Sequence, residues 1–491
     1  MQDSVTYGLL VLAASVAALL AVQSHRLSER IRIPTPAFFL VAAALAVELV
    51  PDLQEPTHRT VERVVTLALL VILFDGGLHI GAGRARAALP AILSLGVLGT
   101  FATAVGAALL VHLVLGVSVY ASVLVATAIA PTDPAVVFSV LGRREIDGAS
   151  GTVLEGESGA NDPVGIALMA ALLGAGSLSS GAVGQVAGTF ALQMVVGTAV
   201  GLLGGRLLLL LMRTALPAEG LYPVRSLVAA GALFGLATVA HGSGFLAVFL
   251  AGIVVGDERA PYKREVERFH SALASLGEVV AFAFLGFTVH LDVLARSDVW
   301  LPGLVVGLAL ALVVRPLLGV VLLLPTRLSR PEKGFVLFAG LKGAVPLLLG
   351  SFLVDRGLEG GTRLYGVVVV VVLVSVVLQA AFVPTAARWF GIRMQAVELE
   401  PFSVGMRVRD EPTGAHRLTV RPGSVADGSS IEQVSGLSEG MWVSLVLRDR
   451  SLVPVRGDTV LQPGDEVLLI VDEEQDPAAL IALFTEGSPI T

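Results

Sequence analysis

The chain has 491 residues, of which 55% are hydrophobic and 15% are charged, and its formal net charge is -7. Soluble domains carry about 25% charged residues, so the composition excludes a single water-soluble globule and also an intrinsically disordered chain. The sequence contains no cysteine, which excludes disulfides, thiolate metal sites and cysteine nucleophiles.

The charge is divided unevenly along the chain. Residues 1–396 hold 26 Lys and Arg against 24 Asp and Glu, whereas residues 397–491 hold 7 against 16. A slight basic excess is typical of a membrane domain with basic loops, and an acidic tail fits a solvated domain that stays off anionic lipid. Nothing indicates nucleic-acid binding. We expect a transmembrane domain at 1–390, a linker at 391–405 and a soluble domain at 406–491.

Hydropathy divides the first 390 residues into about 13 apolar segments separated by short polar loops. The amino terminus lacks the basic flank of a cleavable signal peptide, so we expect the first segment to be retained. The expected membrane spans are 5–22, 36–50, 61–80, 89–116, 119–141, 149–173, 181–213, 221–240, 243–257, 269–291, 298–325, 332–354 and 363–385.

The basic residues of the loops predict the orientation of these spans. With the amino terminus outside, the inner loops hold 18 Lys and Arg and the outer loops hold 5. Cytoplasmic loops are enriched in Lys and Arg. An odd number of spans then places the C-terminal domain in the cytoplasm, beneath the cell (inner) membrane.

The span at 119–141 contains Ala130-Pro131-Thr132-Asp133-Pro134. Each proline disfavours helical geometry at the preceding residue and frees the carbonyl four residues back. We predict an unwound centre whose carbonyls can coordinate a cation, with Asp133 at the start of the following helix. A simple proline kink is the alternative.

The span at 149–173 is the most polar of the set. Ser158 and Asp162 lie on one helical stripe, and Glu157 and Asn161 lie on the next. Charged groups within the hydrocarbon are expensive and are functional candidates by default. One stripe can face a cation while the other ties the helix to a neighbour. Alternatively, the four residues are buried polar groups that pair with one another.

A second span, 332–354, also contains helix-breaking residues at its middle. Gly340, Gly343 and Pro346 flank Lys342 there. The two broken spans are seven apart and so run in opposite directions. This arrangement predicts inverted repeats, spans 2–6 and 9–13, with a site where the broken helices cross.

Depth along the spans suggests two buried ion pairs. Glu157 and Lys342 lie at similar depth, and a pair between them would stabilise both charges in a low dielectric. Glu278 and Arg315 also share a depth, and we interpret them as a structural pair. Asp75, near the inner end of the third span, is either a pathway carboxylate or an interfacial one.

The C-terminal part has a different pattern. Short strand-like runs at Trp442–Leu447 and Glu466–Val471 alternate with turns at Arg456–Asp458 and Pro463–Asp465, and an amphipathic helix at Pro477–Phe484 follows. This pattern predicts a small α+β domain. The fold class expected for the whole chain is an all-α polytopic membrane protein with this domain at its C-terminal end.

The order of these motifs resembles the NhaP-type monovalent cation:proton antiporters over about residues 5–390. The resemblance is carried by Thr132-Asp133-Pro134, by Glu157-Ser158 with Asn161-Asp162, and by a basic residue before Gly-Ala-Val at 343–345. The tail is similar to the TrkA-type C-terminal regulatory domain, in the runs 453–459 and 464–468. This combination is similar to the potassium/proton branch of the family.

The resemblance implies a role for each candidate residue. Asp162 would bind proton and cation alternately, and Ser158, the Thr132 backbone and Asp75 would complete the cation shell. Asn161 and Asp133 would brace the crossing, and Glu157 would pair with the basic residue of span 12. That residue is often Arg in the family and is Lys342 here, and Asp75 stands where relatives commonly have Glu. A homodimer is also implied.

We therefore expect a secondary antiporter that exchanges a monovalent cation for protons by alternating access. The similarity to the potassium/proton branch favours potassium as the cation. It needs no cofactor and is not an enzyme, and a cytosolic nucleotide-type regulator would bind the tail. Sodium/proton exchange is the first alternative. A ligand-regulated potassium channel is the second, although the sequence has no Thr-Val-Gly-Tyr-Gly filter. A membrane sensor that has lost transport is the third.

Overall fold

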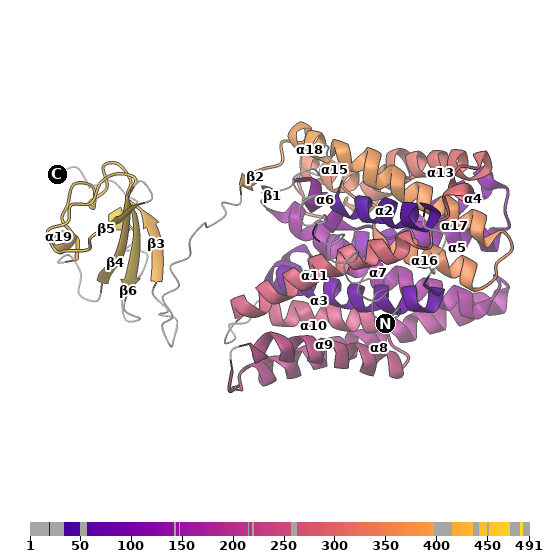
Figure 1. Ribbon diagram of the computed structural model, residues 1–491, viewed down its shortest axis with the longest axis horizontal. Helices are drawn as coiled ribbons and strands as arrows, with labels where there is room; N and C mark the ends of the chain where they lie inside the picture. Colours follow the sequence, from indigo (N-terminus) through magenta and orange to yellow (C-terminus); the bar gives the residue numbers. More distant parts are fainter. Residues whose placement is uncertain are drawn as a thin grey trace, which may run out of the picture. The chain divides into compact units, whose positions relative to one another are not determined.

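The computed structural model describes residues 19, 34–49, 56–141, 144–146, 148–214, 216–218, 220–256, 263–396, 415–435, 441–448, 451–471 and 482–484. The chain divides into two compact units, residues 1–398 and 399–491. The first unit is helical and the second contains a small sheet (Figure 1). The predicted span 5–22 lies outside the described residues except for Leu19.

The first half of the helical unit follows the predicted spans closely. Its helices are α2 (Thr35–Leu49), α3 (His58–Ile92), η1 (Leu93–Leu98), α4 (Gly99–Leu115), α5 (Val119–Ile129), α6 (Pro134–Leu141), α7 (Ala149–Ala175) and α8 (Ser180–Met212). The predicted loop between spans 3 and 4 is instead a kink at Gly81 within α3, where a φ of 66° requires glycine. The kink divides α3 at the end of the predicted third span.

The second half continues in the same way. Its helices are α9 (Leu221–Val239), α10 (Gly244–Gly256), α11 (Lys263–Gly286), α12 (Leu291–Leu294), α13 (Ser297–Ala309), η2 (Leu310–Val314), α14 (Arg315–Leu322), α15 (Arg330–Phe338), α16 (Ala344–Asp355), α17 (Gly361–Leu373), η3 (Val374–Gln379) and α18 (Ala380–Trp389). The three η segments are π-helical turns inside longer helices.

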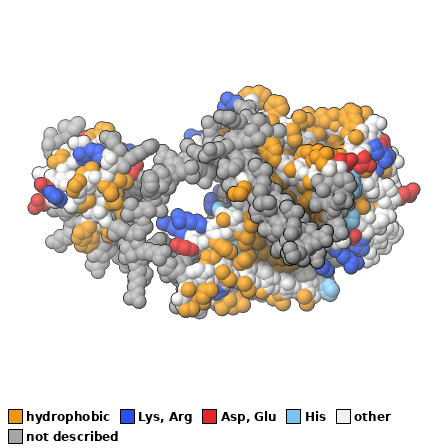
Figure 2. All heavy atoms as spheres, viewed as in Figure 1, with side chains coloured by type: hydrophobic (Ala, Val, Ile, Leu, Met, Phe, Trp, Pro, Cys, Tyr) orange, Lys and Arg blue, Asp and Glu red, His pale blue; other side chains and the backbone are white. Residues whose placement is uncertain are grey.

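Seven helical stretches among the described residues are long and apolar enough to cross a membrane, and three shorter apolar helices accompany them. Many large apolar side chains of this unit are exposed, among them Leu203, Leu207 and Leu210 of α8 and Leu312 and Leu317 near α14. Figure 2 shows hydrophobic side chains gathered along the edge where Figure 1 places α8 and α9. Soluble proteins rarely expose such surface, and a lipid environment explains it.

Two short strands tie the end of the helical unit to the middle of its sequence. β1 (Arg144–Ile146) lies between α6 and α7, and β2 (Met394–Ala396) follows α18. They pair antiparallel, with Ile146 opposite Met394. Residues 394–396 of the predicted linker at 391–405 are thus paired with the segment between α6 and α7.

The C-terminal unit is built on a four-stranded antiparallel sheet. Its elements are β3 (Ala415–Thr419), α19 (Ile431–Ser435), β4 (Met441–Arg448), β5 (Ser451–Val453) and β6 (Glu466–Val471), and the strand order is β3-β6-β4-β5. Both predicted strands are confirmed, as parts of β4 and β6. The predicted helix at Pro477–Phe484 lies outside the described residues apart from 482–484, which are helical.

Asp465 is a buried charged residue of the C-terminal unit, 1% exposed. Its carboxylate accepts two hydrogen bonds of 2.8 Å from the Arg448 guanidinium and another from the Gln462 backbone N–H. Burial alone would raise the pKa of Asp465, but these bonds outweigh it and hold the pKa below its ordinary value. The stability that they contribute is therefore lost only as the pH falls through that lowered pKa.

Candidate functional site

Two breaks in the helices face each other inside the helical unit. The first, Ala130–Asp133, separates α5 from α6, and the second, Ala339–Gly343, separates α15 from α16. The Asp133 backbone N–H donates a 2.7 Å hydrogen bond to the Leu341 carbonyl. The prolines and glycines of both motifs therefore produce the two unwound centres that the sequence predicts, and the centres meet.

Lys342 links one break to the other. Its buried ammonium, 4% exposed, donates to the carbonyls of Ala130 at 2.8 Å and Pro131 at 3.0 Å. The predicted ion pair between Lys342 and Glu157 is wrong, because the proline-rich break presents carbonyl acceptors that bind the ammonium directly. The Ala130 carbonyl, predicted as a cation ligand, is occupied by this bond.

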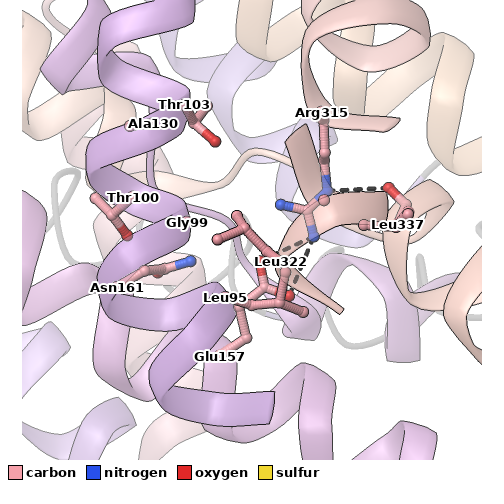
Figure 3. A pocket seen from close by; sticks show the side chains of 11 residues that line it. Leu95, Gly99, Thr100, Thr103, Ala130, Glu157, Asn161, Arg315, Leu322 and Leu337 are labelled. Carbon is pink, nitrogen blue, oxygen red and sulfur yellow. Dashed lines mark hydrogen bonds and ion pairs between the residues drawn. The ribbon is translucent and has the colours of Figure 1, made fainter. Parts of the chain in front are cut away.

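Glu157 pairs with Arg315 at the start of α14 instead. The guanidinium and the carboxylate are 2.9 Å apart, and their side chains are 8% and 2% exposed. Arg315 also donates to the Leu337 carbonyl at 2.9 Å (Figure 3). Arg315 thus joins α7 to the end of α15, beside the second break.

The predicted pair between Glu278 and Arg315 is therefore also wrong. Glu278 lies on α11, and its Oε1 is buried without a hydrogen-bond partner among the described residues. It lies within electrostatic reach of Asp133. Depth along a span fixes the height of a side chain but not the direction in which it points, and Arg315 points to α7.

The Glu157 and Asn161 stripe of α7 is bound to its neighbours. The Asn161 amide donates a 2.7 Å hydrogen bond to the Thr132 hydroxyl, which donates to Glu157 at 3.3 Å. The expectation that one stripe of this helix ties it to adjacent elements is confirmed. Thr132 takes part through its hydroxyl.

Asp162 and Ser158 occupy the other stripe, and both are buried, with Asp162 7% exposed. Asp133 and Lys342 are the charged groups that act on Asp162. The predicted ion-binding carboxylate therefore lies within electrostatic reach of a charged residue of each break, Asp133 of the first and Lys342 of the second.

Asp133 closes the first break. Its carboxylate accepts a 2.9 Å hydrogen bond from the Ala135 N–H at the start of α6 and lies against Gly343, directly before the start of α16. The starts of two helices thus meet at one carboxylate, which offsets the positive ends of both dipoles. This position is consistent with the bracing role that the family resemblance implies for Asp133, which stays a prediction.

Gly343 allows this approach. A Cβ at Gly343 would lie 1.8 Å from Asp133 Oδ2 and 2.4 Å from Asp133 Cβ, so any side chain at position 343 displaces the Asp133 side chain. We expect Gly343→Ala to destabilise the protein by about 1–3 kcal/mol through overpacking and to reduce transport at least tenfold. Gly174→Ala on α7, whose Cβ would meet no atom within 4 Å, is the control. Wild-type transport by Gly343→Ala would contradict the packing described.

The described contacts of Asp75 are made away from the two helix breaks. Its carboxylate accepts a 3.1 Å hydrogen bond from Ser271 of α11 and lies 3.4 Å from the His79 ring. These described contacts join α3 to α11, and none of them is with Ser158 or Asp162. The part of Asp75 in a cation shell stays a prediction.

The π-helical turns surround the site. η1 packs against α7, where a Cβ at Gly96 would lie 3.0 Å from the Glu157 carbonyl. η2 ends at Val314, directly before Arg315, and η3 holds Ser375 and Gln379, which bind the second break. π-helical turns often mark functional sites. Sequence analysis missed Ser375 and Gln379, and their only signal was two polar residues four apart in a valine-rich span.

A small pocket opens beside the Arg315–Glu157 pair. Thr100 and Thr103 of α4 and Asn161 of α7 face it, together with the ion pair itself (Figure 3). Asp162 does not line this pocket, which therefore lies on the braced side of α7.

Broken helices that cross beside a buried carboxylate, in a unit of long apolar helices, define a secondary transporter. Comparison with known proteins identifies its family. Residues 11–389 match the transmembrane sodium/hydrogen exchanger family, and residues 415–478 match the TrkA-C domain. The chain therefore belongs to the sodium/hydrogen exchanger family and is a cation:proton antiporter, not an enzyme.

Two similar relatives are potassium/proton antiporters by name. NhaP2 of Shewanella sp. (strain MR-4) is 29% identical over 485 residues, which cover 96% of this chain and 83% of the relative. NhaP of Alkalimonas amylolytica is 31% identical over 389 residues, which cover 79% and 67%. The sodium proton antiporter MjNhaP1 from Methanocaldococcus jannaschii has the same fold, with a TM-score of 0.65 and 22% identity over 77% of this chain and 97% of that one.

Proposed function

We propose that the protein exchanges potassium for protons across the cell membrane and so regulates cytoplasmic pH and cation content. The observation that carries the proposal is the buried Asp162 beside the crossing of two helix breaks. A buried carboxylate in such a place binds either a proton or a cation, so the two compete for it. The potassium/proton relatives favour potassium as the cation.

Alternating access then follows from movement of one helix bundle against the other. Ser158, the Thr132 backbone and Asp75 complete the cation shell around Asp162. Asn161, Asp133 and Glu157 brace the crossing. Because Asn161 precedes Asp162 where a second acid would add another exchanging proton, we propose one cation for one proton and electroneutral exchange.

The wider organisation is part of the proposal. The chain has thirteen spans, of which spans 2–6 and 9–13 form two inverted repeats. The basic loops place the amino terminus outside and the tail in the cytoplasm, and two copies form a homodimer. Residues 1–390 carry transport, residues 391–405 link the domains, and residues 406–491 bind a cytosolic regulator of nucleotide type. The match to a TrkA-C domain supports the regulatory part.

Proteoliposomes test the exchange directly. Purified protein is reconstituted with an outward or inward pH gradient, and dissipation of the gradient is followed on addition of potassium, sodium or lithium at several pH values. We expect potassium to dissipate the gradient without net current. A preference for sodium would favour the sodium/proton alternative, which the fold shared with MjNhaP1 keeps open, and uncoupled current would indicate a channel.

Removal of the tail separates transport from regulation. All the proposed ion ligands lie before residue 350, so a chain ending at residue 398 should still exchange cations for protons. Its pH or cation dependence should shift, because a regulator biases transport through a coupling of about 1–3 kcal/mol. A chain ending at residue 389 also removes β2, the partner of β1, and should show a larger shift.

The truncated chains are compared with the full-length protein at matched density over a pH series. Profiles that superimpose would mean that the tail is a passive appendage. Complete loss of transport in a folded chain ending at residue 398 would contradict the separation of transport from regulation.

A further inference from the structure

The second helix break is bound by two side chains of η3. The Ser375 hydroxyl accepts a 2.9 Å hydrogen bond from the Lys342 backbone N–H and donates a 3.1 Å bond to the Gln379 side-chain oxygen. The Gln379 amide donates a 2.7 Å bond to the Phe338 carbonyl. These three bonds form a continuous chain, which we call the Ser375–Gln379 clasp, across the two ends of the break.

The clasp satisfies groups that the break leaves without helical partners. Phe338 is the last residue of α15, and Lys342 lies two residues before the start of α16. A helix end leaves backbone groups unpaired, and a buried unpaired group is costly. Ser375 and Lys342 are each 4% exposed, so water does not readily replace the clasp.

The residues that the clasp holds also contact the first break. Lys342 reaches the carbonyls of Ala130 and Pro131, and the Leu341 carbonyl accepts the Asp133 N–H. The position of the second break along η3 therefore sets where these groups meet the first break. Two charged side chains of the described part of the chain lie beside the clasp, Lys342 itself and Arg315, which bonds to Leu337 next to Phe338.

We propose that Ser375 and Gln379 are positioning residues for cation:proton exchange, which fix the second break in the register that the ion site requires. The inference rests on the proposed exchange at Asp162. Because the clasp acts through the backbone of Lys342, its loss should change the apparent affinity for the cation as well as the maximal rate. We expect Gln379→Leu to lower the ratio of maximal rate to half-saturating cation concentration about tenfold, equal to about 1.4 kcal/mol.

Gln379→Glu gives a readout that a purely structural role would not move. A protonated carboxyl at position 379 has one donor for the Phe338 carbonyl and one acceptor for Ser375, as the amide has. An ionised carboxylate has only acceptors, and it faces the Phe338 carbonyl unfavourably. The exchange rate of Gln379→Glu divided by that of wild type at the same pH should therefore rise as the pH falls. The same quotient for Gln379→Leu should not change with pH.

Two control variants match the chemistry of these changes. Ser351→Ala removes a buried hydroxyl of α16 whose one hydrogen bond to a described residue stays within its own helix, to the Leu348 carbonyl. Gln185→Leu removes an exposed amide of α8. Both controls should exchange like wild type. Ser375→Ala should resemble Gln379→Leu, and Ser375→Thr, which keeps the hydroxyl, should recover most of the exchange.

All variants are reconstituted beside wild type, and folding is followed by size exclusion and thermal unfolding. If wild type itself fails to exchange, the proposed function fails, whereas failure of the clasp alters the variants alone. Wild-type kinetics in Gln379→Leu and Ser375→Ala would overturn the proposal. So would a Gln379→Glu profile parallel to that of Gln379→Leu at every pH. If Gln379→Leu does not fold, the comparison of Ser375→Thr with Ser375→Ala decides.

Discussion

Asp162→Asn is expected to abolish cation:proton exchange while leaving a folded protein. Asparagine keeps the volume of the side chain but binds neither an exchangeable proton nor a cation as a carboxylate does. Gradient dissipation in proteoliposomes should fall to the level of empty vesicles for potassium and for sodium. Size exclusion and thermal unfolding should remain close to those of wild type.

The matched control for this change is Asp355→Asn, because Asp355 is an exposed aspartate at the end of α16. It should exchange like wild type. If Asp162→Asn retained coupled exchange, the exchanging group would lie elsewhere. Glu278, whose Oε1 is buried without a hydrogen-bond partner among the described residues, would then be the first residue to change.

The second large effect concerns the buried pair of Glu157 and Arg315. Arg315→Met leaves the Glu157 carboxylate buried without its partner, and Glu157→Gln does the same to the guanidinium. Breaking a buried pair from one side costs about 3–5 kcal/mol. Each single variant should therefore lose stability of this order, measured by unfolding in detergent at fixed pH.

The double variant removes both charges and should be more stable than the sum of the two losses predicts. Such non-additivity measures the pair directly. Glu157→Gln combined with Lys342→Met is the comparison, because Lys342 bonds to carbonyls of the first break and not to Glu157. In this comparison, the stability losses of the two single variants should be closer to additive. A larger coupling to Lys342 than to Arg315 would contradict the contacts described here.

The sequence by itself determined the architecture and the positions of its special features. Apolar runs of membrane-spanning length dictate helices, because backbone groups in lipid must bond within their own segment. Prolines and glycines at residues 131, 134, 340 and 343 lack an N–H or a Cβ, so the two breaks follow from local chemistry. The spacing of Glu157, Ser158, Asn161 and Asp162 likewise fixes two stripes on one helix, and the structure confirms that one of them is bound to its neighbours.

Only the tertiary structure decided which charge binds which partner. The depth of each residue along its span predicts ion pairs between Lys342 and Glu157 and between Arg315 and Glu278. In the structure, Arg315 pairs with Glu157, and Lys342 donates to two backbone carbonyls. The direction of each side chain depends on helix rotation and packing, which the sequence does not encode locally. The carbonyls that bind the Lys342 ammonium become available only where a helix breaks beside another element. The same holds for the Lys342 backbone N–H, which donates to Ser375, and for the Phe338 carbonyl, which accepts from Gln379.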